Sequence, residues 1–437
     1  PRPWPRGHPE RGNRAMGARY FQDFDWLILL PAVLLIALGL LTLYSIDHVP
    51  AEFRGDFQPT KTGAFERQLI WALAGLVVMT IACLVPFTYY DGMAVIFYCV
   101  GLVLLVAVLF APAVKGARRW IDIGGFNLQP SEFMKIAVIF MLARFLAEKR
   151  NRPDSFRVLI IGAAIAFVPF LLVMKEPDLG TSLVFLALLF PVMYWRGIDE
   201  SLLILFMTPL LSALLTVFSA TAAERGSYPF LLLLFFIVIL IAAYRRRRDL
   251  FRSISLVGLN VGVMLLVPMV WNRLEPYQQK RILTFLRPES DILGSGWQVY
   301  QSKLAIGSGG FMGKKFLHGT HKLLAFLPER HSDFIYSVLS EEFGFLGALV
   351  LLVLFSIIII RGLYLATKVK NRFASIVAVG ICSYFAFHAI VNIGMTTGLI
   401  PVTGLPLPFM SYGGSSMVVS CFLVGVLLNF SRRFYEY

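Results

Sequence analysis

The acidic residue best placed to do chemistry is Asp291, in a long polar segment between Trp271 and Asp333. Pro288 and Gly294 flank it and favour a turn that presents the carboxylate on a constrained backbone. Many basic residues share the segment, and a carboxylate among cations suits a general base. The alternative is an Asx turn, in which the carboxylate only accepts hydrogen bonds from nearby backbone amides. The sequence leaves both interpretations open.

The same polar segment is predicted to be ordered. It contains the large apolar side chains Trp297, Tyr300, Phe316 and Phe326, and a flexible linker has no use for buried aromatic surface. We therefore expect a cap that packs on a helix bundle and places charges over it, since long ordered loops are usually functional. The alternative is an exposed and inert loop.

A second group of ionisable residues separates two apolar runs. Lys175, Glu176 and Asp178 surround Pro177, and Thr181 follows. Ionisable residues at a break between membrane helices commonly mark a functional site. The alternative is a proline-bearing turn with a local Lys–Asp pair at a helix end.

The third candidate is segment 404–416, which opens the last apolar run with two prolines and two glycines before Ser415. Its backbone amides, with the hydroxyls of Ser411, Ser415 and Ser416, would suit an anion at a helix N-terminus. An ordinary loop-to-helix junction is the alternative.

Two other patterns do not meet the requirements of a site. Segment 307–315 resembles a phosphate-binding loop, but the spacing is wrong and Lys315 stands where Ser or Thr should be. His318, His321 and His331 have no cysteine or completing carboxylate nearby, so we expect no zinc site.

The elements that position these residues must be membrane helices. The chain of 437 residues is 57% hydrophobic and 15% charged, against about 25% charged in soluble domains. Its mean hydropathy is +0.72. Each crossing needs about 20 apolar residues. The sequence therefore predicts an all-α polytopic membrane protein with about 12 transmembrane helices, at 26–46, 68–86, 92–112, 132–147, 158–174, 180–195, 202–220, 229–243, 254–271, 334–360, 373–398 and 411–430.

The positions of Lys and Arg predict the orientation. A cytoplasmic N-terminus, 1–25, puts most basic clusters inside, the C-terminus inside and the loop 272–333 outside. Topology then explains most of the net charge of +14 without nucleic acid. Lys115, Arg118 and Arg119 remain outside in the short turn 115–131, which indicates an anionic ligand at the outer face. The alternative is contact with lipid headgroups.

Several motifs, in order along most of the chain, resemble the SEDS family (shape, elongation, division and sporulation), and its RodA branch more than FtsW. The segment 328–331, which reads Pro-Glu-Arg-His, favours RodA. The matching segments are 116–122, 129–132 with Lys135, 176–182, 288–296 with Gln301 and Ser302, 326–335 and 404–416.

This resemblance implies a glycosyltransferase of the bacterial cytoplasmic (inner) membrane that polymerises peptidoglycan from lipid II. It implies that Asp291 is the general base. The implied partners are a class B penicillin-binding protein and other membrane proteins of the elongation complex. Residues matching the cluster near the substrate cavity are Arg119, Trp120, Glu132 and Lys135, and those matching a second cavity motif are Glu176, Asp178 and Thr181.

Two departures from the family pattern stand out. The family has ten spans, so 26–437 is expected to be a single domain with an extra helix pair at 202–243. Ile292 stands where Pro is common and Lys315 where Gly is common, which could alter the loop geometry without removing the carboxylate.

The chemistry of lipid II agrees with this resemblance. Diphosphate is a good leaving group and needs cations, while the attacking hydroxyl needs a base, so one carboxylate suffices. Single displacement would invert the anomeric carbon. Arg118, Arg119, Lys303 or a divalent cation (Mg or Mn) would hold the diphosphate. The rivals are a transporter that flips lipid II, which charges at broken helices also fit, and a structural scaffold of the elongation machinery.

Overall fold

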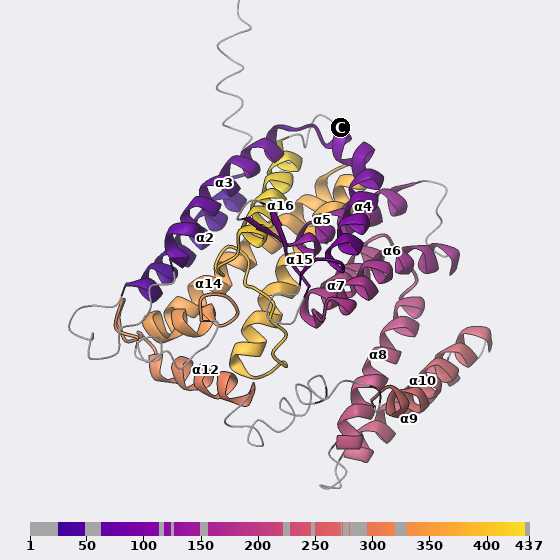
Figure 1. The fold of residues 1–437 in the computed structure, drawn as a ribbon. Helices are drawn as coiled ribbons and strands as arrows, with labels where there is room; N and C mark the ends of the chain where they lie inside the picture. Colours follow the sequence, from indigo (N-terminus) through magenta and orange to yellow (C-terminus); the bar gives the residue numbers. More distant parts are fainter. Residues whose placement is uncertain are drawn as a thin grey trace, which may run out of the picture.

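The computed structural model describes residues 25–48, 63–112, 118–123, 126–148, 156–221, 228–245, 250–271, 273, 279, 295–319 and 330–432. Within these residues the chain is almost entirely helical (Figure 1). The helices are α2 (Trp26–Asp47), α3 (Ala64–Leu84), α4 (Phe87–Val108), α5 (Pro130–Ala147), α6 (Phe156–Lys175), α7 (Leu179–Trp195), α8 (Glu200–Thr221), α9 (Tyr228–Arg245), α10 (Leu250–Trp271), α12 (Ser295–Gly309), α14 (Ile335–Lys368), α15 (Arg372–Thr397) and α16 (Gly414–Arg432).

All twelve predicted spans coincide with a helix of this set, because a long apolar run satisfies its backbone only by forming internal hydrogen bonds. Among the described residues, eight helices are long and apolar enough to cross a membrane: α2, α3, α4, α6, α10, α14, α15 and α16. Helix α7 and stretches of α8 and α9 are apolar but shorter. The multi-pass membrane architecture is confirmed, and the number twelve stays a prediction.

The predicted polar turn 115–131 contains a small hairpin. Strand β1 (Ile121–Ile123) pairs antiparallel with β2 (Phe126–Leu128), with Ile121 opposite Leu128. Pro130 then begins α5, where its missing N–H costs nothing. The hairpin therefore connects Trp120 to the first turn of α5.

Contacts between helix termini show that the main bundle has two distinct ends. At one end Asp25 accepts hydrogen bonds from Arg361 (2.8 Å) and Ser431 (3.3 Å), which ties the start of α2 to the ends of α14 and α16. Asn429 donates to the carbonyl oxygens of Cys83 and Val85 at 2.7 Å each. The other end, which we call the site end, carries the end of α2 and α6 and the start of α5, α7, α14 and α16.

Helices α15 and α16 form the centre of the main bundle, and 72% of the apolar window of each is buried. α15 packs against α5, α7 and α14, while α16 packs along α3. Their central position explains why polar residues on α15, such as His388 and Asn392, are fully buried.

Helices α8, α9 and α10 stand apart from the main bundle (Figure 1). They pack on one another around a small core of Leu205, Ile239 and Leu256, and α8 also touches α7. The predicted extra pair 202–243 corresponds to α8 and α9, so these two helices share a separate core with α10.

The described part of the segment 272–333 is ordered, with α12 packed on α14 and α15. Helix α14 has a break at Gly344, whose φ of 64° is non-helical. The backbone that follows α12 forms hydrogen bonds with α14 at this break. Lys314 N–H donates to the Glu341 carbonyl at 2.9 Å and Phe345 N–H donates to Gly310 at 2.9 Å. Segment 307–315, which only superficially resembled a phosphate loop, thus serves to dock α12 on α14.

Candidate functional site

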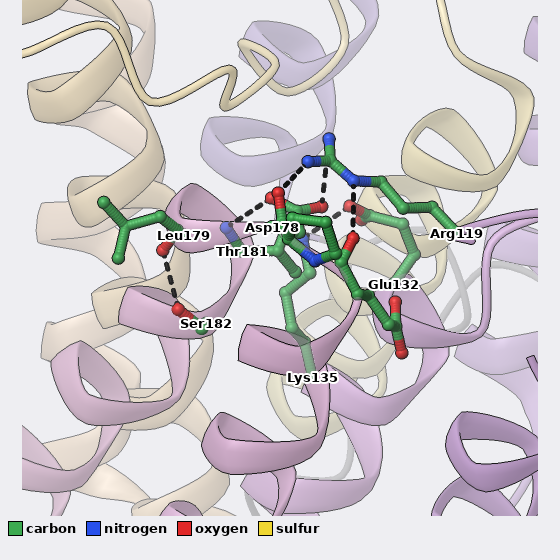
Figure 2. Close-up of polar contacts among 9 residues, drawn as sticks. Arg119, Glu132, Lys135, Asp178, Leu179, Thr181 and Ser182 are labelled. Carbon is green, nitrogen blue, oxygen red and sulfur yellow. Dashed lines mark hydrogen bonds and ion pairs between the residues drawn. The ribbon is translucent and has the colours of Figure 1, made fainter. Parts of the chain in front are cut away.

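The turn between α6 and α7 is clamped by Arg119 (Figure 2). Its guanidinium donates to the carbonyl oxygens of Glu176 (3.2 Å) and Pro177, and lies 3.8 Å from the Asp178 carboxylate. Asp178 caps α7 by accepting hydrogen bonds from the Thr181 backbone (3.2 Å) and hydroxyl (3.0 Å). The structure therefore brings together four of the predicted site residues.

Glu176 is fully buried in this turn. Neither of its carboxylate oxygens has a hydrogen-bond partner within the described residues. The pKa of Glu176 is raised to about 8, chiefly by burial and also by the nearby Asp178 carboxylate, while Arg119 lowers it. A buried carboxyl group next to a carboxylate favours its neutral form, so burial and Asp178 both favour protonation of Glu176.

Gly180 lets this turn approach the loop that follows α15. A Cβ at Gly180 would collide with the carbonyl oxygen of Thr403 and approach Leu405 at 3.1 Å. Only glycine allows this close approach of two backbones. The second and third candidate segments, 175–181 and 404–416, therefore lie against each other.

Glu132 and Lys135 form a buried ion pair in the first turns of α5, with Lys135 Nζ 2.6 Å from Glu132 Oε1. The i,i+3 spacing puts both on one helix face. Lys135 Nζ also lies 3.4 Å from His388 Nε2 and 5.5 Å from the centre of the Tyr384 ring, both on α15. Figure 2 shows Glu132 and Lys135 near the Arg119 turn.

Ser411 and Ser415 act within the protein in this structure. The buried Ser411 hydroxyl donates to the Ser332 carbonyl at 2.6 Å and accepts from Leu407 N–H at 2.8 Å. Ser415 Oγ accepts from Gln129 N–H at 3.3 Å. Ser411 and Ser415 thus join segment 404–416 to Ser332 and to the N-cap of α5. α16 begins at Gly414, three residues later than predicted.

The remaining predicted cations lie at the surface of the site end. Arg118 is exposed and donates to the Leu109 carbonyl at 2.8 Å. Lys175 and Lys303 are exposed and Trp120 is half-buried. Lys303 lies over Gly398, the C-cap of α15, where a Cβ would touch its Nζ at 2.6 Å. A cation there complements the negative end of a helix.

Sequence reasoning missed a second polar cluster at the same end. Glu341 and Glu342 are buried in the first half of α14. Lys314 donates to Glu341 at 2.8 Å, Ser45 donates to Glu342 at 2.6 Å, and Asp47 accepts from the Phe65 backbone at 2.9 Å. Two adjacent glutamates inside the predicted span 334–360 were the signal that could have found it. His388 in span 373–398 was a comparable signal.

Asp291 lies outside the described residues, as does the rest of 280–294. In the described chain, α12 begins four positions after it, at Ser295. Among those described residues, no group of three or more His, Cys, Asp or Glu side chains could hold a metal ion. The described side chains therefore do not build a metal site by themselves.

These features define a multi-pass membrane protein with a cluster of buried and exposed charges at one end of its helix bundle. A family model named for FtsW, RodA and SpoVE, and described as "Cell cycle protein", matches residues 25–225 and 200–436. The chain therefore belongs to the FtsW/RodA/SpoVE family, which confirms the resemblance to SEDS proteins.

Individual relatives cover almost the whole chain. Peptidoglycan glycosyltransferase MrdB of Escherichia coli (strain K12) is 37% identical over 412 residues, which is 93% of this chain and 94% of MrdB. Peptidoglycan glycosyltransferase RodA of Treponema pallidum (strain Nichols) is 32% identical over 441 residues, 96% of this chain and 100% of the relative. A solved structure reported under the heading of structural coordination of polymerization and crosslinking by a peptidoglycan synthase complex has a TM-score of 0.69 at 26% identity. It covers 95% of this chain and 99% of that one.

Proposed function

We propose that this chain is a peptidoglycan glycosyltransferase that polymerises lipid II into glycan strands during rod-shape elongation. The observation that carries the proposal is the match to MrdB and RodA, both named for this activity, over more than nine-tenths of the chain. The charged clusters at the site end support it, because a diphosphate-linked donor needs cations and a base.

In the proposed reaction, the Asp291 carboxylate takes the proton of the acceptor hydroxyl. The hydroxyl oxygen attacks the anomeric carbon of the donor sugar, and the bond to the diphosphate breaks as the diphosphate leaves. One displacement inverts the anomeric configuration. The base must lie within hydrogen-bond reach of that hydroxyl. Helix α12, which begins four positions after Asp291, packs on α14 and α15 and limits how far Asp291 can lie from the site end.

Arg118, Arg119 and Lys303 are the proposed ligands of the diphosphate. Arg118 and Lys303 are exposed at the site end. Arg119 is partly exposed, and its guanidinium also contacts the α6–α7 turn. Lys175 is also exposed there. Exposed cations retain N–H donors for an anion, and each charge-assisted hydrogen bond to phosphate is stronger than a neutral one.

A divalent cation, Mg or Mn, stays a separate proposal. The described residues offer no three-ligand metal site, and magnesium is usually bound by one or two carboxylates together with substrate phosphates. The binding of such an ion would thus need oxygen ligands from the diphosphate itself. The steps proposed for this chain's residues do not depend on it.

The proposed topology has twelve spans, the termini in the cytoplasm and the loop 272–333 outside. The described basic residues support it, since Arg196, Arg361, Lys368, Arg372 and Arg432 lie at the end opposite the site end. A membrane-impermeant thiol reagent should label Thr320→Cys in intact cells and Ser155→Cys only after permeabilisation. The reverse pattern refutes the orientation.

The proposed partner is a class B penicillin-binding protein that crosslinks the new strand, with other membrane proteins of the elongation complex. The similar solved structure is described as a peptidoglycan synthase complex that coordinates polymerization and crosslinking. Because the family model covers FtsW as well as RodA, rescue of a strain depleted of its elongation enzyme, but not of one depleted of its division enzyme, would support the elongation role.

Purified protein incubated with lipid II, with and without the partner, tests the activity. Asp291→Asn should abolish glycan strands while leaving the thermal unfolding midpoint unchanged, since Asn keeps the shape but cannot take the proton. Glu275→Gln, elsewhere in the same loop, is the matched control and should stay active. An active Asp291→Asn protein refutes the base role.

The two rival functions predict other results. A flippase should move labelled lipid II across a vesicle bilayer and tolerate Asp291→Asn. A scaffold should make no strands from purified lipid II, and its loss of function should follow substitutions on the membrane-facing surface.

A further inference from the structure

His388 connects two parts of the site end from the centre of the bundle. The ring is fully buried on α15. Its Nδ1 atom lies 3.0 Å from the carbonyl oxygen of Pro406, in the loop before α16. Its Nε2 atom lies 3.4 Å from Lys135 Nζ on α5. The imidazole therefore bridges two residues that the chain keeps 271 positions apart (406 minus 135).

The two contacts require one protonation state of the ring. A carbonyl oxygen only accepts hydrogen bonds, so Nδ1 must carry the proton. An ammonium group only donates, so Nε2 must be the acceptor. The neutral imidazole with the proton on Nδ1 satisfies both partners at once.

Lys135 contacts three other side chains of the protein. Its ammonium donates to Glu132 Oε1 at 2.6 Å and faces His388 Nε2. The Tyr384 ring lies 5.5 Å away and offers its negative face to the cation. Lys135 has no exposed area. Its ammonium group thus faces two hydrogen-bonding atoms and one aromatic ring of the protein.

Glu132 is the third residue in this series of contacts, after His388 and Lys135. Oε1 accepts from Lys135, while Oε2 is buried and has no hydrogen-bond partner within the described residues. Leaving a buried acceptor without a partner is unfavourable. A ligand with an O–H or N–H donor would supply the missing hydrogen bond.

We propose that His388 is a positioning residue for glycosyl transfer. It holds Lys135, and Lys135 fixes Glu132 so that Oε2 accepts a hydrogen bond from a hydroxyl or amide N–H of the lipid-linked saccharide. This inference rests on the proposed function, and it assigns Lys135 an internal role in place of the predicted contact with substrate.

Two substitutions at His388 separate its two contacts. In His388→Gln the side-chain carbonyl can occupy the position of Nε2 and still accept from Lys135, while the bond to Pro406 is lost. In His388→Asn the amide N–H can occupy the position of Nδ1 and still donate to Pro406, while Lys135 loses its acceptor. We expect Asn to raise the KM for lipid II about tenfold, the effect of one charge-assisted hydrogen bond, and Gln to stay within about twofold of wild type.

The opposite ranking, with Gln impaired and Asn normal, would show that His388 only anchors the Pro406 loop and would overturn the proposal. Two variants that both match wild type would overturn it as well. If the wild-type protein makes no strands at all, the proposed function fails instead, so the two failures are distinguishable.

A double-mutant cycle combines Glu132→Gln with His388→Asn. If the His388 variant does not fold, Lys135→Met takes its place in the cycle. Glu132→Gln replaces the Oε2 acceptor by a donor and should raise KM by itself. Residues that act through one another give non-additive changes, so Glu132→Gln should add less than about twofold to the KM of His388→Asn or Lys135→Met. Fully multiplicative effects would overturn the proposal.

Discussion

The hydroxyl of Ser45 in α2 donates a hydrogen bond of 2.6 Å to Oε1 of Glu342 in α14, across 297 positions of the sequence. Both side chains are buried. The adjacent Glu341 accepts from Lys314 at 2.8 Å, in the segment that follows α12. This pair of glutamates therefore joins α2, α14 and the segment that follows α12 at the site end.

Ser45→Ala should destabilise the protein by about 1.5–3 kcal/mol, because it removes a buried hydrogen bond to a charged group. Thermal unfolding in detergent measures the effect. Thr80→Ala is the control, since the Thr80 hydroxyl only donates to Leu76 on an exposed helix face. Equal shifts of the unfolding midpoint in the two variants would contradict the role assigned to Ser45.

Arg119→Lys should lower the rate of strand synthesis at least tenfold. A lysine ammonium cannot reproduce the planar set of donors that serves Glu176, Pro177 and Asp178 together. Assays at several lipid II concentrations separate binding from turnover. Arg144→Lys, which changes an arginine beside Asp91 at the opposite end, should remain close to wild type. Full activity of Arg119→Lys would show that the clamp is dispensable.

Glu176 should make stability depend on pH. Its folded pKa of about 8 lies above the usual 4.5, so the folded state binds a proton that the unfolded state releases between these values. Stability should therefore fall as pH rises from about 4.5 to 8 and then level off. Glu176→Gln, which imitates the protonated form, should remove this decline.

The measurement is the unfolding midpoint of Glu176→Gln and wild type at pH 5, 6.5 and 8. The variant should gain stability over wild type as pH rises, by an amount on the order of a few kcal/mol at pH 8. Asp178→Asn serves as the comparison, because asparagine also caps a helix and the Glu176 carboxyl stays in place, so stability should still decline as pH rises. A pH-independent difference for Glu176→Gln would count against the burial of a neutral carboxyl.

Gly344→Ala should destabilise the protein by more than about 2 kcal/mol. Gly344 has a φ of 64°, and a Cβ there would collide with Gly313 N and lie 2.7 Å from the Phe311 carbonyl oxygen. Gly262→Ala in α10 is the control, since its Cβ would meet nothing within 4 Å and alanine favours a helix by about 1 kcal/mol. The two variants should shift the unfolding midpoint in opposite directions.

Removal of divalent ions tests the cofactor proposal. If a divalent cation helps to hold the diphosphate, treatment with EDTA should slow strand synthesis, and Mg or Mn should restore the rate. The unfolding midpoint without lipid II should not change, because the described residues offer no three-ligand site for an ion. Unchanged synthesis after chelation would refute the divalent cation and support the cationic side chains as the ligands of the diphosphate.

The sequence alone was sufficient to place twelve of the thirteen described helices, but not α12, which lies in the segment predicted only as an ordered cap. Each of the twelve apolar runs is helical, because a run of this length must satisfy its backbone hydrogen bonds internally in a membrane. The motif 175–181 was also readable, since a proline, ionisable residues and a glycine between two apolar runs mark a turn. These features depend on residues close together in the chain.

Only the tertiary structure decided which groups contact one another. Lys135 meets His388 across 253 positions, Ser45 meets Glu342, and the Ser411 hydroxyl bonds the Ser332 carbonyl. The sequence period of a helix shows which residues share a face, but the choice of neighbouring face comes from the packing of the whole bundle. The partners of each buried charge are therefore properties of the assembled bundle, because no single helix contains both sides of the contact.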